Sequence, residues 1–70
     1  MNKLNLLEKV GLTLRNKRRK LKLSQMTLAN NCWMNHGDIS EIERGKVNIT
    51  IRTLIKLCNA LHIPIRRIFY

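Results

Sequence analysis

Apolar residues recur at intervals of three and four between positions 4 and 21, which is the period of an amphipathic helix. Lysines and arginines fill most of the off-stripe positions near the end of this segment. The spacing predicts one long first helix, with Arg18 as the only charged residue on its buried face. The stripe consists of Leu4, Leu7, Gly11, Leu14, Arg18 and Leu21.

Capping residues predict where three further helices begin and one of them ends. Ser24 and Thr50 each precede an apolar-periodic segment, and their hydroxyls can accept a hydrogen bond from a first helical turn. Asn35 holds the same position before a third segment, and Asp38 three residues later favours the positive end of a helix. Gly45 ends that segment, because glycine adopts the left-handed conformation at little cost.

The last third of the chain completes an all-α prediction. In the helix after Thr50 we expect His62 at the end and a buried face of Ile51, Leu54, Ile55, Cys58 and Leu61. Pro64 begins a short final turn over residues 64–69. Strand-like alternation is absent, as are linkers and repeats. We therefore predict a compact bundle of five short helices that forms a single domain over residues 1–70.

The charge balance points to an anionic partner. Fourteen Lys and Arg against four Asp and Glu give a formal charge of +10 in 70 residues. Nucleic acid is the first candidate and an acidic membrane surface the second. Four acids and two histidines argue against an ordinary enzyme. No apolar run reaches the length of a membrane span, and the N-terminus lacks the apolar core of a signal peptide.

The two cysteines are expected to be structural. Cys32 and Cys58 lie in apolar helical stretches without the CxxC spacing of metal or redox sites. They predict reduced core thiols in a cytoplasmic protein, with no metal and no cofactor.

Residues 25–45 contain the informative motif. Two helices of about eight residues, joined by a tight turn, follow a basic helix, as in helix-turn-helix DNA readers. The chain resembles the XRE-type, or Cro and lambda-repressor-like, helix-turn-helix domain over about residues 10–69. The Asn48-Ile49-Thr50-Ile51 connection is also similar to that of restriction–modification controller proteins. The matching positions are Gly11, Leu14-Arg15, Arg18, Leu23-Ser24-Gln25, Leu28-Ala29, Ile39-Ser40, Ile42-Glu43-Arg44-Gly45, Thr53-Leu54, Ala60-Leu61, Ile63-Pro64 and Ile68-Phe69.

The resemblance implies a recognition helix at about residues 36–44 that enters the major groove. Asp38 has an alternative role as a capping carboxylate. Glu41 departs from the family's usual residues: it can accept from cytosine N4 but is repelled by phosphates. Expected base contacts are His36, Gly37, Asp38, Ser40 and Glu41. Expected phosphate contacts are Ser24, Gln25, Asn35, Arg44, Lys46, Arg15 and Lys17.

Three structural expectations accompany this site. Arg18 should form a buried ion pair with Glu43, the family's matching acid. Trp33 stands where the family usually has glycine, so either the turn shifts or, as we favour, the indole packs over a neighbouring surface. Related small regulators dimerise through their last two helices, which implies an interface that includes Ile65, Ile68, Phe69 and Tyr70.

The sequence thus predicts a transcription regulator, with activation and repression both open, that binds a short palindromic operator in double-stranded DNA as a homodimer. We expect no catalysis, small-molecule ligand or membrane contact, and a cytoplasmic protein of bacterial or phage origin. The alternative is a protein–protein module of the same fold, of the antitoxin or anti-repressor type, favoured by Asp38 and Glu41 on the reading face. A membrane-active cationic peptide is disfavoured, because such peptides do not need capped helices.

Overall fold

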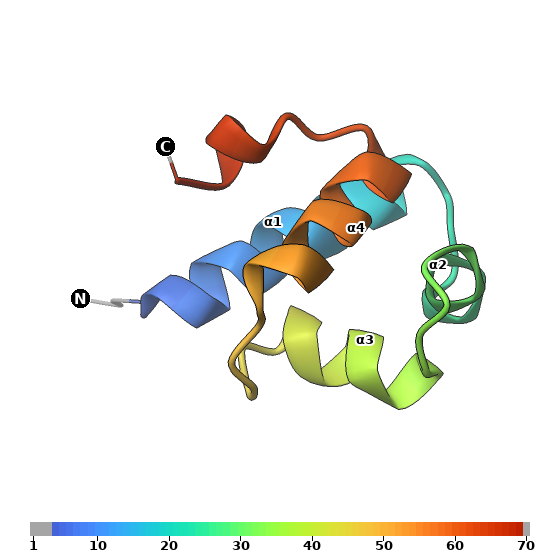
Figure 1. The fold of residues 1–70 in the computed structure, drawn as a ribbon, viewed down its shortest axis with the longest axis horizontal. Coiled ribbons are helices and arrows are strands. Elements are labelled where there is room, and N and C mark those ends of the chain that lie inside the picture. The colour runs from blue at the N-terminus through green and yellow to red at the C-terminus, as the bar shows by residue number, and fades with distance from the viewer. Residues whose placement is uncertain (1–3, 70) are drawn as a thin grey trace.

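The computed structural model describes the backbone of residues 4–69 and the side chains of residues 4–68. It contains α1 (Leu6–Lys20), α2 (Gln25–Asn31), α3 (His36–Glu43), α4 (Ile51–Leu61) and a 3-10 helix, η1 (Ile65–Phe69). Helices α1 and α4 lie side by side in the middle, with α3 on one side and the C-terminal segment on the other (Figure 1). The predicted all-α fold is confirmed. No helix within the described range is long and apolar enough to cross a membrane.

Side-chain caps explain where most of these helices begin. The predicted caps Ser24 and Thr50 accept hydrogen bonds from the third residue of α2 and of α4, at 3.0 and 3.1 Å. Asn5 forms a capping box with Glu8 at the start of α1. Asn35 occupies the N-cap position of α3, but its side chain makes no cap hydrogen bond to the described residues.

One hydrophobic core joins the helices. The residues that α4 contributes to this core differ from the predicted buried face of that helix. Ile51 and Ile55 are 63% and 44% exposed, whereas Leu57 is fully buried. The inward positions of α4 are Leu54 and the residues three, four and seven positions after it, namely Leu57, Cys58 and Leu61. The helix is therefore rotated relative to the prediction. The N-terminal half of α4 therefore leaves two isoleucines, one turn apart, in contact with solvent.

Helix α3 packs closely on α1 because residue 11 is a glycine. A Cβ at Gly11 would lie 2.6 Å from the carbonyl oxygen of Glu43 and would also contact the carbonyl oxygen of Ile42. Gly45, with φ of 69°, then turns the chain away from α3 in the left-handed conformation. This packing buries one side of α3 and leaves the opposite side free for a ligand.

The two cysteines are core residues, as predicted. Both thiols are free and buried, with Cys32 3% and Cys58 1% exposed. Burial raises the pKa of both groups, since the interior disfavours a thiolate. For Cys32 the charge of Lys56 partly opposes the rise in pKa.

Candidate nucleic-acid interface

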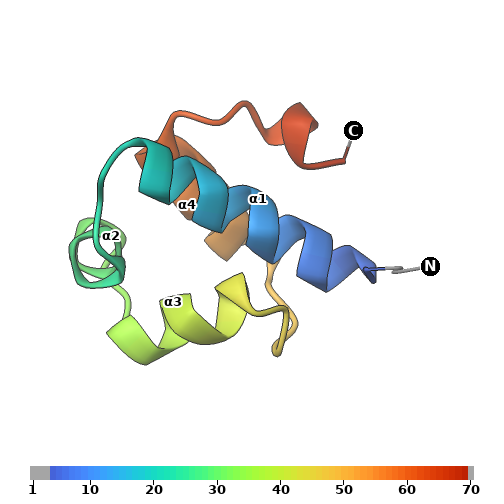
Figure 2. The same cartoon turned by 180° about the vertical axis from the view of Figure 1, so that it is seen from behind.

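The turn between α2 and α3 places α3 across the end of α2. Leu28 and Ala29 of α2 and Ile39 of α3 are each 1% exposed in the core that joins the two helices. The amide of Met34 donates to the carbonyl of Ala29 at 2.8 Å and closes the turn. Figure 2 shows α3 from behind, with one side toward α1 and the other facing outward.

Arg18 and Glu43, the predicted partners, meet between α1 and α3. Arg18 Nε donates to Glu43 Oε2 at 2.6 Å and Nη2 donates to Oε1 at 3.0 Å. Their side chains are 9% and 3% exposed. The hydrogen bonds to Glu43 raise the pKa of Arg18 more than burial lowers it, and the negative charge of Glu43 raises it further. This bidentate pair fixes α3 on α1.

A chain of hydrogen bonds extends from this ion pair to the first residue of α3. Gln25 Nε2 donates to Glu43 Oε1 at 3.0 Å, and Gln25 Oε1 lies 3.0 Å from His36 Nε2. The ionised carboxylate of Glu43 can only accept, so the Gln25 amide group must face it and the Gln25 carbonyl must face His36. His36 Nε2 therefore carries a proton. In the neutral imidazole, Nδ1 is then an acceptor.

The outer side of α3 begins with three exposed residues. His36, Gly37 and Asp38 are exposed, and Ser40 and Glu41 are half-buried. Apart from its chain neighbours and the nearby backbone of α3 itself, no described atom lies within 4 Å of a Cβ built on Gly37. The fold therefore has no steric need for glycine at this position, and another residue would fit. Because this space is open to solvent, a ligand could approach the backbone of α3 closely at Gly37.

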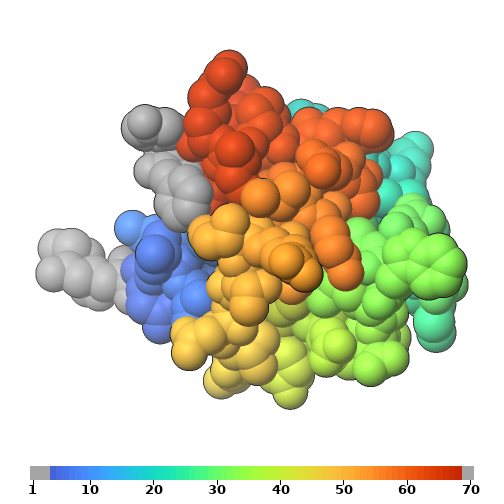
Figure 3. Space-filling view, in the orientation of Figure 1, coloured from blue at the N-terminus to red at the C-terminus, as the bar shows by residue number. Residues whose placement is uncertain are grey.

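The two acids on this side of α3 lie beside the following loop. Asp38 and Glu41 help to line a hollow of about 280 Å³, together with residues 47–50 of the loop. Glu41 also lies 3.7 Å from Arg44 in an exposed i,i+3 pair. The positive charge of Arg44 offsets part of the repulsion that Glu41 would meet from phosphates. In Figure 3, α3 and the loop after it form one continuous surface at the bottom of the view.

The predicted phosphate contacts fall into two groups. The first group lies at the start of α2 or at the two ends of α3, and the second group, Arg15 and Lys17, lies on α1. Gln25 bonds to Glu43 and His36 through one N–H of Nε2 and through Oε1, so the second N–H of Nε2 is its remaining donor. Arg44 Nε donates to the carbonyl of Ser40 at 3.4 Å. Lys17 lies elsewhere, in a groove between α1 and the C-terminal segment. Those at or near α2 and α3 are Ser24, Gln25, Asn35, Arg44 and Lys46, while Arg15 is half-buried on α1.

Trp33 corrects one expectation. Its backbone adopts the left-handed conformation with φ of 57°, so the turn keeps the geometry that a glycine would have. The indole is 93% exposed and does not pack over a neighbouring surface. A short turn between two fixed helices dictates the backbone angle, and at this angle the side chain points away from the core. Two further non-glycine residues adopt this conformation: Lys22 between α1 and α2, with φ of 60°, and His62 at the end of α4, with φ of 59°.

The residues expected at a dimer interface differ in their exposure. Ile65 is 41% exposed, whereas Ile68 is 6% exposed in the core of the single chain. The side chain of Phe69 and the whole of Tyr70 lie outside the described residues. The exposed isoleucines of α4, Ile51 and Ile55, were not predicted as surface residues. The two lie four residues apart in the sequence, and the sequence predicted both in the core.

Two short helices joined by a tight turn, with the second open to solvent, define the helix-turn-helix class of DNA-binding folds. The helix-turn-helix family matches residues 14–68, and the chain belongs to that family. No curated protein matches the sequence closely enough to count as a relative.

Solved structures of DNA-binding regulators share this fold. The restriction–modification controller protein C.AhdI from Aeromonas hydrophila is 36% identical, with a TM-score of 0.85 over 90% of this chain and 96% of that one. The clp gene regulator ClgR from C. glutamicum is 27% identical, with a TM-score of 0.89 over 96% and 87%. The controller protein C.Esp1396I, solved as a tetramer in complex with its natural 35 base-pair operator, is 28% identical, with a TM-score of 0.83 over 96% and 88%.

Proposed function

We propose that the protein is a sequence-specific transcription regulator that binds a short palindromic operator in double-stranded DNA as a homodimer in the bacterial cytoplasm. The observation that carries this proposal is the exposed first turn of α3, tied by hydrogen bonds to a buried ion pair. A reading helix needs side chains that reach base edges from a rigid support. The similarity to C.Esp1396I, whose complex contains operator DNA, supports double-stranded DNA as the ligand.

His36 carries the sharpest specificity in this proposal. When Nε2 donates to Gln25, the neutral form of the ring has its acceptor at Nδ1, which we propose faces the groove. In the major groove, the amino groups of adenine and cytosine are the donors that such an acceptor would select. Gly37 allows close approach of the backbone, and the remaining base contacts are Asp38, Ser40 and Glu41.

Replacement of Gln25 by Met tests this assignment. The variant keeps the length of the side chain but removes the acceptor for His36 Nε2, so both ring tautomers become available. We expect the preference for an amino-bearing base at one operator position to relax, while the other positions keep theirs. Thr27→Met on the exposed side of the same helix is the control. An unchanged preference in Gln25→Met would remove His36 Nδ1 from the reading set.

Phosphate contacts at both ends of the helix pair supply register and affinity. Lys46 is an exposed cation just after α3, and Arg44 precedes it. At the other end, α2 begins with Gln25, which is only half-buried while it holds His36. The proposed set is Ser24, Gln25, Asn35, Arg44, Lys46 and Arg15.

The dimer is supported by apolar side chains that the single chain leaves exposed. Ile51 and Ile55 lie one turn apart on α4, and Ile65 follows on η1. Isolated exposed hydrophobics are common, but two on one helix face fit a partner surface. We propose that these three residues, rather than Ile68, contact the second subunit. Ile51→Ser/Ile55→Ser should shift sedimentation toward a monomer at tens of micromolar; an unchanged sedimentation coefficient would contradict this interface.

Gly37→Ala separates a role in folding from a role in binding. Alanine fits the open space at this position and stabilises a helix by about 0.5–1 kcal/mol relative to glycine. We therefore expect a slightly higher melting temperature together with weaker binding to duplexes selected from a random pool. If binding is unchanged, Gly37 does not approach DNA.

A protein–protein module remains the second candidate, because Asp38 and Glu41 line a hollow on the same face. A basic protein segment would suit two carboxylates better than DNA does. Under this alternative, neutralising Glu41 weakens the binding of the partner protein and leaves DNA preference unchanged.

A further inference from the structure

Most of the positive charge lies outside the proposed reading unit. Residues 24–50 contain the cations Arg44 and Lys46 and the acids Asp38, Glu41 and Glu43, a formal charge of minus one. All the other members of the set of 14 Lys and Arg residues belong to α1, the turn after it, α4 and the termini. The charge of +10 is therefore not explained by the surface that reads bases.

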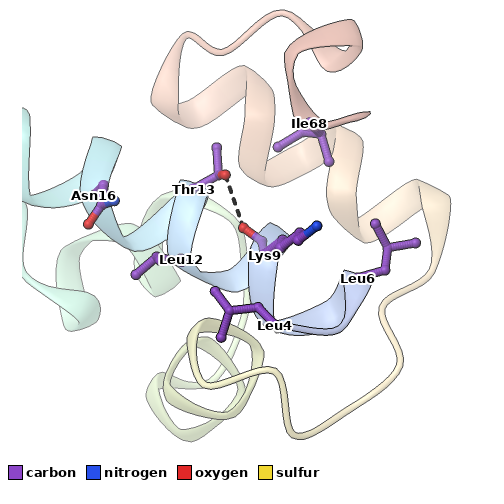
Figure 4. Close-up of a pocket in the computed structure, with 7 residues that line it drawn as sticks. All are labelled: Leu4, Leu6, Lys9, Leu12, Thr13, Asn16 and Ile68. Carbon is purple, nitrogen blue, oxygen red and sulfur yellow. Dashed lines mark hydrogen bonds between the residues drawn. The ribbon is translucent and has the colours of Figure 1, made fainter. Parts of the chain in front are cut away.

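Part of this charge gathers along a groove between α1 and the C-terminal segment. Two hollows of about 440 and 260 Å³ share Thr13 and Asn16, so they adjoin along α1, and together they are called the groove here. Figure 4 shows Lys9, Thr13 and Asn16 following one another along α1, with Ile68 of η1 facing them. None of the described residues that line the groove is acidic. Its cations are Lys9, Lys17, Lys20 and Arg67.

The groove and the reading helix lie on opposite sides of the molecule. Helix α1 contacts α3 through Gly11 and Arg18, which lie seven residues apart on one face. Thr13, Asn16 and Lys20 lie about half a turn away from that face. Both ribbon views place α3 and the C-terminal segment on opposite sides of α1 and α4 (Figures 1 and 2). One straight duplex seated on α3 cannot reach this groove.

We infer that this groove binds the phosphate backbone of a second segment of duplex DNA. From Lys9 to Lys20 the cations follow α1 for about 16 Å, which is the axial length of about five base pairs. Hydroxyl and amide groups of Thr13 and Asn16 between them suit phosphate and sugar oxygens. The inference rests on the proposed function in one respect: a regulator held on DNA meets other DNA segments as its nearest polyanions.

A capture experiment tests the groove while the reading helices are occupied. The operator duplex chosen from a random pool is immobilised and saturated with protein, and a labelled random-sequence duplex is then added. The groove variant is Lys17→Gln/Lys20→Gln/Arg67→Gln. Its control is Lys22→Gln/Lys56→Gln/Arg66→Gln, which removes equal charge at exposed residues that do not line the groove. Both variants are first shown by melting to fold.

We expect the wild type and the control to capture the second duplex and the groove variant to capture at most about a tenth as much. In free solution, the salt dependence of binding to random duplex should also lose about 0.9 in slope for each cation removed that had contacted a phosphate. Capture by the groove variant equal to that of the wild type overturns the inference, as does an equal loss in the control. Polyglutamate serves as a second probe, in place of the labelled duplex. If the groove variant loses polyglutamate binding while its duplex binding is unchanged, the inference is overturned and the ligand is an acidic protein surface instead.

The inference and the proposed function fail separately. If no sequence is enriched from the random pool, the proposed function is wrong, and the salt dependence on random duplex still tests the groove. If a sequence is enriched but the groove variant behaves as the wild type in both measurements, only the groove is wrong.

Discussion

Removing one member of the Arg18–Glu43 pair should destabilise the protein more than any other single polar substitution considered above. The two side chains are 9% and 3% exposed, so either charge left alone would be buried without its counter-ion. Breaking such a pair costs about 3–5 kcal/mol. A domain of 70 residues is stable by roughly 4–10 kcal/mol in total. Arg18→Met and Glu43→Leu should each lower the melting temperature by at least about 12 °C.

The double variant distinguishes a buried charge from a loss of packing. Arg18→Met/Glu43→Leu removes both charges and fills the space with apolar groups, so it should be at least about 2 kcal/mol more stable than either single variant. Some loss remains, because Arg18 also donates to the carbonyl of Leu23 at 2.7 Å. Arg19→Met, an exposed arginine on the same helix, is the control and should change stability by less than about 0.5 kcal/mol. Urea denaturation of the four variants is the assay. The reasoning is refuted if Arg18→Met behaves as Arg19→Met, or if the double variant is no more stable than the single ones.

Three further predictions concern binding, the turn and the thiols. If a dimer neutralises about eight phosphates, the slope of log K against log[salt] should be near −7, and binding with a slope near zero would remove the electrostatic argument. Trp33→Asn should stabilise the protein by about 0.5–1 kcal/mol, since Asn tolerates the left-handed conformation and the exposed indole contributes little burial; Met26→Asn, inside α2, should destabilise it. Burial raises the pKa of Cys32 and Cys58 above the ordinary 9.0, so the unfolded chain releases these protons first and the free energy of unfolding should fall as the pH rises past about 9. A Cys32→Ala/Cys58→Ala variant should lose that part of the alkaline decline, and an equal decline in both proteins would contradict it.

The sequence predicted the features that depend on local chemistry or on one helix period. Ser24 and Thr50 were recognisable as caps because each precedes an apolar-periodic segment and its hydroxyl can accept a hydrogen bond from a backbone amide of the first helical turn. Arg18 was predicted as buried because it falls on the apolar stripe of α1, and its partner Glu43 followed from the family resemblance.

Features that depend on how two elements meet were not predictable in the same way. The rotation of α4 exposes Ile51 and buries Leu57, and periodicity alone fits either arrangement when apolar residues are frequent. The exposed Trp33 reflects a backbone angle fixed by the two helices on either side. The link from Glu43 through Gln25 to His36 joins residues 18 and 11 positions apart, and only the packing of α2 on α3 reveals it.

The central claim is that α3 reads DNA sequence, and selection of bound duplexes from a random pool tests it most directly when wild type and Glu41→Gln are compared. The wild type should enrich a palindrome with half-sites about 34 Å apart, including a cytosine where the Glu41 carboxylate meets an amino group. Glu41→Gln should keep or raise overall affinity and relax the preference for that base pair by about 1–3 kcal/mol. Enrichment of no sequence by the wild type would contradict the claim, and identical preferences in both proteins would remove Glu41 from the reading surface.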